Sequence, residues 1–188
     1  MINNAMVAKR SEEMKNSTQL TLGEIILKLE TVKNKNLPIF FDKTKYVPTG
    51  LCSWRGSYCE LAVQYENGGD YCYEQPKPDC IRDEAPFGRD HSYKCPCGGT
   101  PKHKTSLPEK PTVSDFLAVL KLALGKYFVG YKGGDFTMGK TTPVWVANDG
   151  NCSGFLKEKG AEYNSDQSIV DITETEKKVI LNTQKTDY

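Results

Sequence analysis

The clearest signal of the fold class lies in residues 112–125, Thr112-Val113-Ser114-Asp115-Phe116-Leu117-Ala118-Val119-Leu120-Lys121-Leu122-Ala123-Leu124-Gly125. Thr112 and Asp115 stand three residues apart, which is the spacing of two side chains that cap the start of a helix. Apolar residues then recur at helical intervals until Gly125, a residue type that often follows a helix end. The pattern predicts a helix whose wide apolar face is buried against a sheet.

The residues before this helix contain a second helix and two strands. Thr21 and Glu24 have the same capping spacing, and the apolar residues that follow predict an amphipathic helix over 21–33. The short apolar run 37–41 predicts a buried strand, with Pro38 placing its start at an edge or in a loop. Residues 57–66 alternate between polar and apolar, as a half-buried strand does.

Three further strands are expected after the second helix, over 144–147, 168–172 and 178–182, with 174–177 as the turn of a terminal hairpin. This order of elements lacks the strict strand–helix alternation of a parallel sheet. The sequence therefore predicts an α+β fold, in which two helices pack on one face of an antiparallel sheet of about five strands.

The chain of 188 residues fits one domain over 21–188, preceded by a polar tail over 1–20. Residues 68–110 are expected to form an insertion. The segment is rich in cysteine, proline and glycine, has six prolines between Pro76 and Pro108, and shows no apolar periodicity.

Charge and hydropathy argue against a general nucleic-acid-binding protein, a secreted protein and a membrane protein. Lys and Arg number 25 against 24 Asp and Glu, so no general field attracts nucleic acid and any anion site is local. The first twenty residues lack the apolar run of a signal peptide, and no apolar stretch is long enough to cross a bilayer. We therefore expect a cytoplasmic protein without membrane contact.

The segment between the first two strands has the residue types of an anion and base site. It offers a forked guanidinium, hydroxyl donors, aromatic faces and a small residue beside them. The candidate ligand-binding residues there are Tyr46, Thr49, Ser53, Trp54, Arg55, Gly56 and Tyr58. The alternative is that the aromatic residues belong to the core and that Arg55 is a surface charge.

A second such segment follows the second helix. Tyr131, Lys132, Gly133 and Gly134 again combine an aromatic ring, a cation and glycines that let the backbone approach a phosphate. The alternative is an ordinary loop joining two strands. Because an anion site usually needs convergent donors, the two segments together favour one ligand pocket.

The insertion also holds candidate metal ligands. Four cysteine thiolates could close a tetrahedral zinc site and so order a segment that is poor in apolar residues. These are Cys72, Cys80, Cys95 and Cys97, with His91 and His103 nearby. The alternative is free thiols, since a single residue separates Cys95 from Cys97 and the spacing is irregular. Structural zinc is thus one expectation, and no other cofactor is required.

A catalytic role has less support in the sequence. The two histidines both lie in the insertion, and the chain lacks the motifs of hydrolases, metalloproteases and nucleotide-binding loops. Isolated carboxylates such as Asp42 or Asp135 leave a metal-dependent nuclease or phosphodiesterase as a weaker alternative. We therefore expect a binding protein without enzymatic activity.

Three stretches together resemble a family of small, largely uncharacterised phage-encoded proteins: Tyr46 to Ala62, Gly130 to Gly134 and Thr142 to Ala147. The resemblance covers most of the chain outside the tail and the insertion, and the insertion departs from the family pattern. It implies work against bacterial defence in the cytoplasm of the host cell. The expectation is a homo-oligomeric protein that sequesters a small cyclic nucleotide immune signal without cleaving it. A protein that inhibits a host enzyme by direct contact is the alternative.

Overall fold

Both predicted helices begin at a capping box in the computed structural model, which describes residues 19–53, 61–65, 71–73, 101–129, 135–146, 153–161 and 166–186. Helix α2 spans Leu22–Thr31 and helix α3 spans Val113–Ala123. The Thr112 amide donates to Asp115 Oδ2 at 2.8 Å, and the Asp115 amide donates back to Thr112 Oγ1 at 3.2 Å. Hydrogen bonds from the Thr112 side chain and amide hold the pKa of Asp115 below its usual value. The predictions of both helices are confirmed.

The strands form two sheets. The larger sheet has six strands in the order β1-β10-β9-β8-β3-β2. Their bounds are β1 Ile39–Phe41, β2 Gly50–Ser53, β3 Leu61–Gln64, β8 Val144–Val146, β9 Gln167–Glu174 and β10 Val179–Lys185. The smaller sheet has four strands in the order β5-β4-β6-β7. Their bounds are β4 Tyr71–Tyr73, β5 Pro101–Lys104, β6 Tyr127–Val129 and β7 Asp135–Thr137.

The α+β class is confirmed, but the prediction of an antiparallel sheet of about five strands is wrong in two respects. The larger sheet has six strands and is mixed, because β1 pairs with β10 in parallel and β3 pairs with β8 in parallel. A second sheet was also not predicted. Each parallel pair joins strands far apart in sequence, which periodicity within one segment does not reveal. The terminal hairpin β9–β10 is confirmed, with Thr175 and Lys178 closing its turn.

The stretch predicted as an insertion is described only at its two ends. Residues 71–73 and 101–104 pair with each other as the antiparallel strands β4 and β5. Residues 74–100 lie outside the described part of the chain, as do the first 18 residues of the predicted tail.

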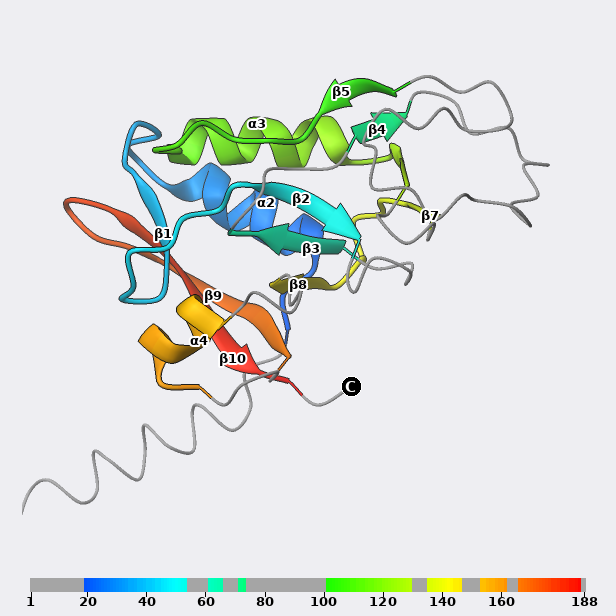
Figure 1. Cartoon of the computed structure of the whole chain (residues 1–188). Coiled ribbons are helices and arrows are strands. Elements are labelled where there is room, and N and C mark those ends of the chain that lie inside the picture. The colour runs from blue at the N-terminus through cyan, green and yellow to red at the C-terminus, as the bar shows by residue number, and fades with distance from the viewer. Residues whose placement is uncertain are drawn as a thin grey trace, which may run out of the picture.

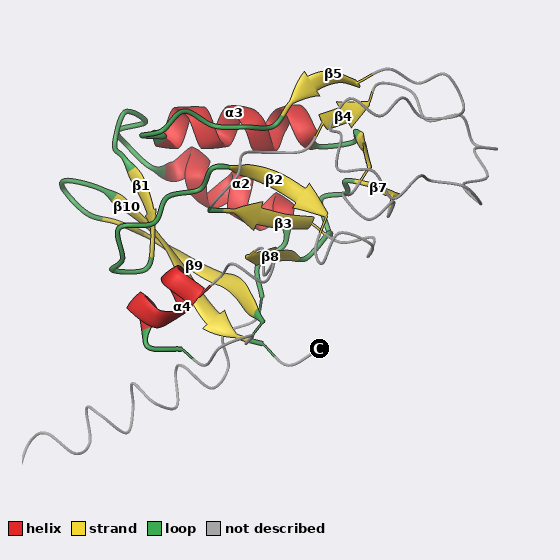
Figure 2. Ribbon diagram, viewed as in Figure 1, coloured by secondary structure: helices red, strands yellow, loops and turns green. Residues whose placement is uncertain are grey.

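One apolar core lies between the helices and the curled six-stranded sheet. Helices α2 and α3 lie side by side, and each buries its apolar stripe in this core (Figure 1). Helix α4, Ser153–Lys159, lies near β9 and β10 and adds Phe155 and Leu156 (Figure 2). The side chains with no exposed surface come from both helices and from most of the larger sheet's strands; they include Leu22, Ile25, Phe116, Leu120, Phe41, Val63, Val144 and Leu181.

The residues before α2 are fixed between two strands of the larger sheet. The Leu20 amide donates to the Ile169 carbonyl at 2.8 Å, and the Val144 amide donates to the Leu20 carbonyl at 3.1 Å. Gly23 then passes so close to the backbone of Lys140 that a Cβ atom would lie 3.0 Å from its carbonyl oxygen. Helix α2 therefore starts from a position set by β8 and β9. No helix in the described ranges is long and apolar enough to cross a membrane.

Replacing Thr112 with alanine tests the contribution of the capping box of α3. We expect Thr112→Ala to lower the free energy of unfolding by about 0.5–2 kcal/mol, because the Asp115 amide loses its acceptor and the Asp115 carboxylate loses the hydrogen bond from the Thr112 hydroxyl. Urea unfolding followed by circular dichroism measures the change. The control is Ser114→Ala, since Ser114 lies exposed in the same turn.

The same pair of proteins tests the lowered pKa of Asp115. A carboxylate whose pKa is depressed by folding stabilises the fold above its unfolded-state pKa, and this contribution disappears as the pH falls through the folded-state value. The stability difference between wild type and Thr112→Ala should therefore shrink below pH 4, near the ordinary range of aspartate at about 3.9. A difference that stays constant into strong acid would contradict this assignment.

Candidate functional site

The predicted ligand-binding residues are divided between described and undescribed parts of the chain. Tyr46, Thr49 and Ser53 are described, Ser53 as the last residue of β2. Trp54, Arg55, Gly56 and Tyr58 lie outside the described residues, and so do Tyr131, Lys132, Gly133 and Gly134. The structure therefore locates the strands that lead into both segments.

These strands lie against each other. Strand β2 leads directly into Trp54, and β6 leads directly into Gly130. The two strands belong to different sheets, yet they are in contact. Because both are short, no residue in either lies more than about 10 Å along the strand from its exit end. In Figure 1 the arrowhead of β2 points toward the end of the molecule where β7 lies.

Strand β2 is held at its outer edge by the segment that follows β5. The Leu107 amide donates to the Thr49 carbonyl at 2.8 Å. The buried Thr105 hydroxyl donates to the Leu51 carbonyl at 3.1 Å. On its other side β2 pairs with β3, and the Thr49 amide donates to the Gln64 carbonyl at 2.8 Å. The chain thus passes from the smaller sheet onto the edge of the larger one, which fixes the strand that leads into Arg55.

Tyr46 lies at the opposite end of β2 from Trp54. Its ring makes edge contacts with Tyr65 and Phe155, at centroid distances of 5.6 and 5.8 Å. The Lys45 ammonium lies 5.7 Å from the Tyr46 ring centroid, within the range of a cation–π contact. The structure therefore places Tyr46 in an aromatic cluster that includes core residues, and does not bring it to the end of β2 from which Trp54 follows.

A polar cluster that the sequence analysis missed joins β1, β10 and α4. Lys159 Nζ lies 3.0 Å from Asp42 Oδ2 and also donates to the carbonyl and hydroxyl of Thr183. The Thr183 amide and hydroxyl donate to the Asp42 carboxylate at 2.8 and 2.6 Å. Burial lowers the pKa of Lys159, and the nearby Asp42 carboxylate opposes that shift.

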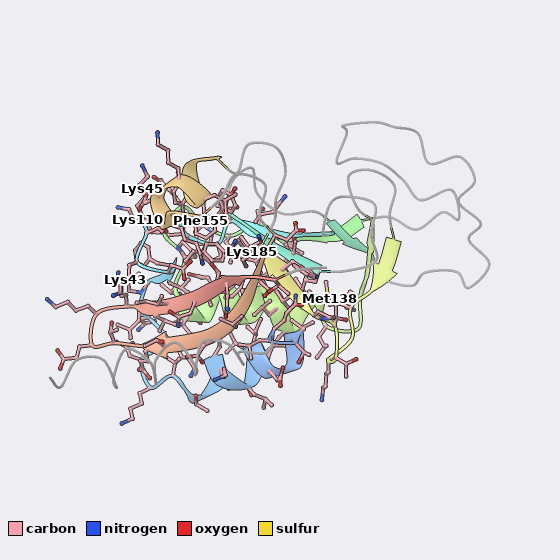
Figure 3. All side chains as sticks on the ribbon, turned by 90° about the horizontal axis from the view of Figure 1, so that it is seen from below. Lys43, Lys45, Lys110, Met138, Phe155 and Lys185 are labelled. Carbon is pink, nitrogen blue, oxygen red and sulfur yellow. The ribbon has the colours of Figure 1, made fainter. Side chains whose placement is uncertain are left out.

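The cluster of Asp42, Lys159 and Thr183 stabilises the turn after β1. Asp42 has a φ of 48°, a left-handed backbone conformation that few residues other than glycine adopt. Its side chain and amide are both tied to β10, since the Asp42 amide donates to the Leu181 carbonyl at 2.9 Å. Lys43 and Lys45 project from this turn toward the outside, while Phe155 lies inside (Figure 3). Every donor of the Lys159 ammonium has an acceptor, so the geometry favours a structural role over a catalytic one.

Replacing Lys159 tests whether its hydrogen bonds stabilise the turn after β1. Lys159→Met keeps most of the side-chain volume and removes its charged hydrogen bonds, which should lower the free energy of unfolding by about 1–3 kcal/mol. Lys157→Met is the control, because Lys157 is exposed on the same helix. Equal stabilities of the two variants in chemical denaturation would contradict the role.

One of the predicted metal ligands, Cys72, lies in the smaller sheet. The register of β4 and β5 places Cys72 directly opposite His103. Opposite residues of an antiparallel pair have Cα atoms about 4.5–5.5 Å apart. Cys80, Cys95 and Cys97 lie outside the described residues. Among residues with described side chains, no group of three metal-binding side chains occurs.

Metal analysis tests whether Cys72 and His103 bind an ion. Protein purified without added zinc should carry about one zinc per chain if the thiolate and imidazole act as ligands. Cys72→Ser and His103→Asn should each lower that content, whereas Cys52→Ser, on β2, should leave it unchanged. A content near zero in the wild type removes the zinc prediction.

No family model, curated protein or solved structure matches this chain. The resemblance to phage proteins therefore stays a prediction.

Proposed function

We propose that this protein binds a small cyclic nucleotide and holds it without cleaving it, and that it thereby withdraws an immune signal from the defence of a phage-infected cell. The observation that carries the proposal is the contact between β2 and β6. Both segments with ligand-binding residue types start from these two strands. Convergence of two cationic segments is what a pocket for a multiply charged anion needs.

Each residue type has a chemical role in this proposal. Arg55 and Lys132 hold phosphate oxygens through charged hydrogen bonds, with the guanidinium suited to bidentate contact. Trp54, Tyr58 and Tyr131 stack on the flat bases. Gly56, Gly133 and Gly134 let the backbone amides approach the phosphates closely.

The fixed position of β2 supports the proposal of tight binding. Strand β2 is hydrogen-bonded along both edges, by β3 on one side and by residues 105–107 on the other. A site that is already ordered loses less conformational entropy when a ligand binds, and tight sequestration requires a small loss. Pockets closed by a second copy of the chain would bury a small ligand further, so the proposal includes a homo-oligomer in the host cytoplasm.

Incubating the purified protein with a panel of cyclic di- and trinucleotides tests the proposal. The retained nucleotide, released by heating and identified by mass spectrometry, should be intact. Arg55→Ala and Lys132→Ala should each weaken retention by about 1.5–3 kcal/mol, because each removes charged hydrogen bonds. Lys33→Ala is the matched control, since Lys33 is an exposed lysine after α2.

Three outcomes contradict the proposal in different ways. Shortened products would show a nuclease or phosphodiesterase. No depletion of any nucleotide would favour a protein partner, such as a host enzyme. Retention that is unchanged in both alanine variants would remove Arg55 and Lys132 from the site.

A further inference from the structure

Lysines gather around β1, at one edge of the larger sheet. Four of them form a group that we call the β1 lysine cluster: Lys43, Lys45, Lys110 and Lys178. Lys43 and Lys45 lie in the turn after β1, and Figure 3 shows both at the same end of the molecule as Lys110. These three side chains are exposed, and Lys178 is partly exposed. The cluster therefore presents its positive charge to solvent.

Backbone hydrogen bonds bring the separate segments of the cluster to β1. The Ile39 amide donates to the carbonyl of Pro111, the residue after Lys110, at 3.1 Å. On the other side of the strand, β10 pairs with β1 in parallel, and its first residue, Val179, directly follows Lys178. Three segments that are far apart in sequence thus carry their lysines to one strand.

Two of the lysines lie over aromatic rings that are themselves partly exposed. Lys178 Nζ lies 5.3 Å from the centroid of the Phe40 ring, and Lys45 Nζ lies 5.7 Å from that of the Tyr46 ring. Such cation–π contacts attract the ammonium groups to the ring faces. Aromatic residues are also enriched at protein interfaces. The cluster thus combines positive charge with apolar surface that a partner can cover.

Carboxylates do not balance the charge of the cluster. Within the described ranges, the lysines that form salt bridges are Lys28, Lys121 and Lys159, and none belongs to the cluster. Asp42 lies in the same turn as two cluster lysines but is bonded to Lys159 and Thr183. Like charges on one surface repel each other, and a partner of opposite charge relieves that repulsion.

Two glutamates beside the cluster favour an acidic peptide over nucleic acid as this partner. Glu158 accepts a hydrogen bond from the Lys45 amide at 2.7 Å, and the exposed Glu109 precedes Lys110. A duplex carries one negative charge per about 1.7 Å of its axis, so its phosphates would meet the glutamates as well as the lysines. A peptide carries its carboxylates on separate side chains, which can pair with the lysines and avoid the glutamates.

We propose that the β1 lysine cluster is a docking surface for an acidic segment of a partner protein. Carboxylates of that segment pair with the lysines, and its apolar groups contact Phe40 and Tyr46. The surface goes beyond the proposed function and does not rest on it. Tyr46 precedes β2, whereas the candidate nucleotide-binding residues from Trp54 onward follow that strand.

Fluorescence anisotropy with a labelled octaglutamate peptide tests the surface. Replacing Lys43, Lys45 and Lys110 together with glutamine should weaken binding of the peptide by about threefold to a hundredfold, because each exposed ion pair contributes a small amount. Binding should also weaken as salt is added, since salt screens exposed charges. An octaglutamine peptide should not bind, and circular dichroism checks the fold of each variant.

A second triple variant is the matched control. Replacing Lys28, Lys121 and Lys140 with glutamine lowers the net charge by the same amount, but these exposed lysines lie on α2, on α3 and before β8. At 0.1 M salt, charges more than about 10 Å away are largely screened, so this variant should bind the peptide as the wild type does. Equal weakening in the two triple variants would show an effect of net charge and overturn the surface.

Other ligands give separate outcomes. Binding of a short DNA duplex or of phosphatidylserine vesicles that is tighter than binding of the peptide, and is lost in the cluster variant, would overturn the assignment of a peptide partner. No binding of the peptide by folded wild-type protein would overturn the surface. Retention of a cyclic nucleotide should be unchanged in the cluster variant, and its loss would overturn the separation of the two sites. The surface and the proposed function can therefore fail independently.

Discussion

The structure depends on the burial of one apolar layer between two helices and a curled sheet. Leu22, Ile25 and Leu29 of α2 and Phe116 and Leu120 of α3 have no exposed surface, and they pack with residues from most strands of the larger sheet. Burial of this kind is the dominant favourable term in folding. This layer positions the capping boxes and the polar cluster around Lys159. It also positions β2 and β6, the strands that lead into the two segments with candidate ligand-binding residues.

The junction of the two sheets is the second constraint, because it links the core to the candidate site. Thr105 belongs to the core side and also holds the outer edge of β2 through the Leu51 carbonyl. An edge strand normally presents unpaired backbone groups, and covering them keeps the strand in one place. Strand β2, which contacts β6, is thereby hydrogen-bonded on both sides.

Sequence signals that act over a few residues correctly predicted the helix starts and the terminal turn. Thr21 with Glu24 and Thr112 with Asp115 act over three residues, so the helix starts could be located from the sequence, as could the turn between β9 and β10. The parallel pairing of β1 with β10 and the bond between Asp42 and Lys159 join residues more than a hundred positions apart, and no periodicity marks them. For the site, composition indicated Arg55 and Lys132, whereas the contact of their strands required the tertiary structure.

The parallel pairing of β1 with β10 also has a consequence for synthesis of the chain. Strand β1 ends at Phe41, but its partner β10 begins at Val179, so the ribosome must make all the residues between them before the sheet can close. Closing so large a loop costs entropy and slows folding. Until β10 has been made, Ile39 and Phe41 lack their neighbouring strand, and the nascent chain exposes apolar residues that later become part of the core.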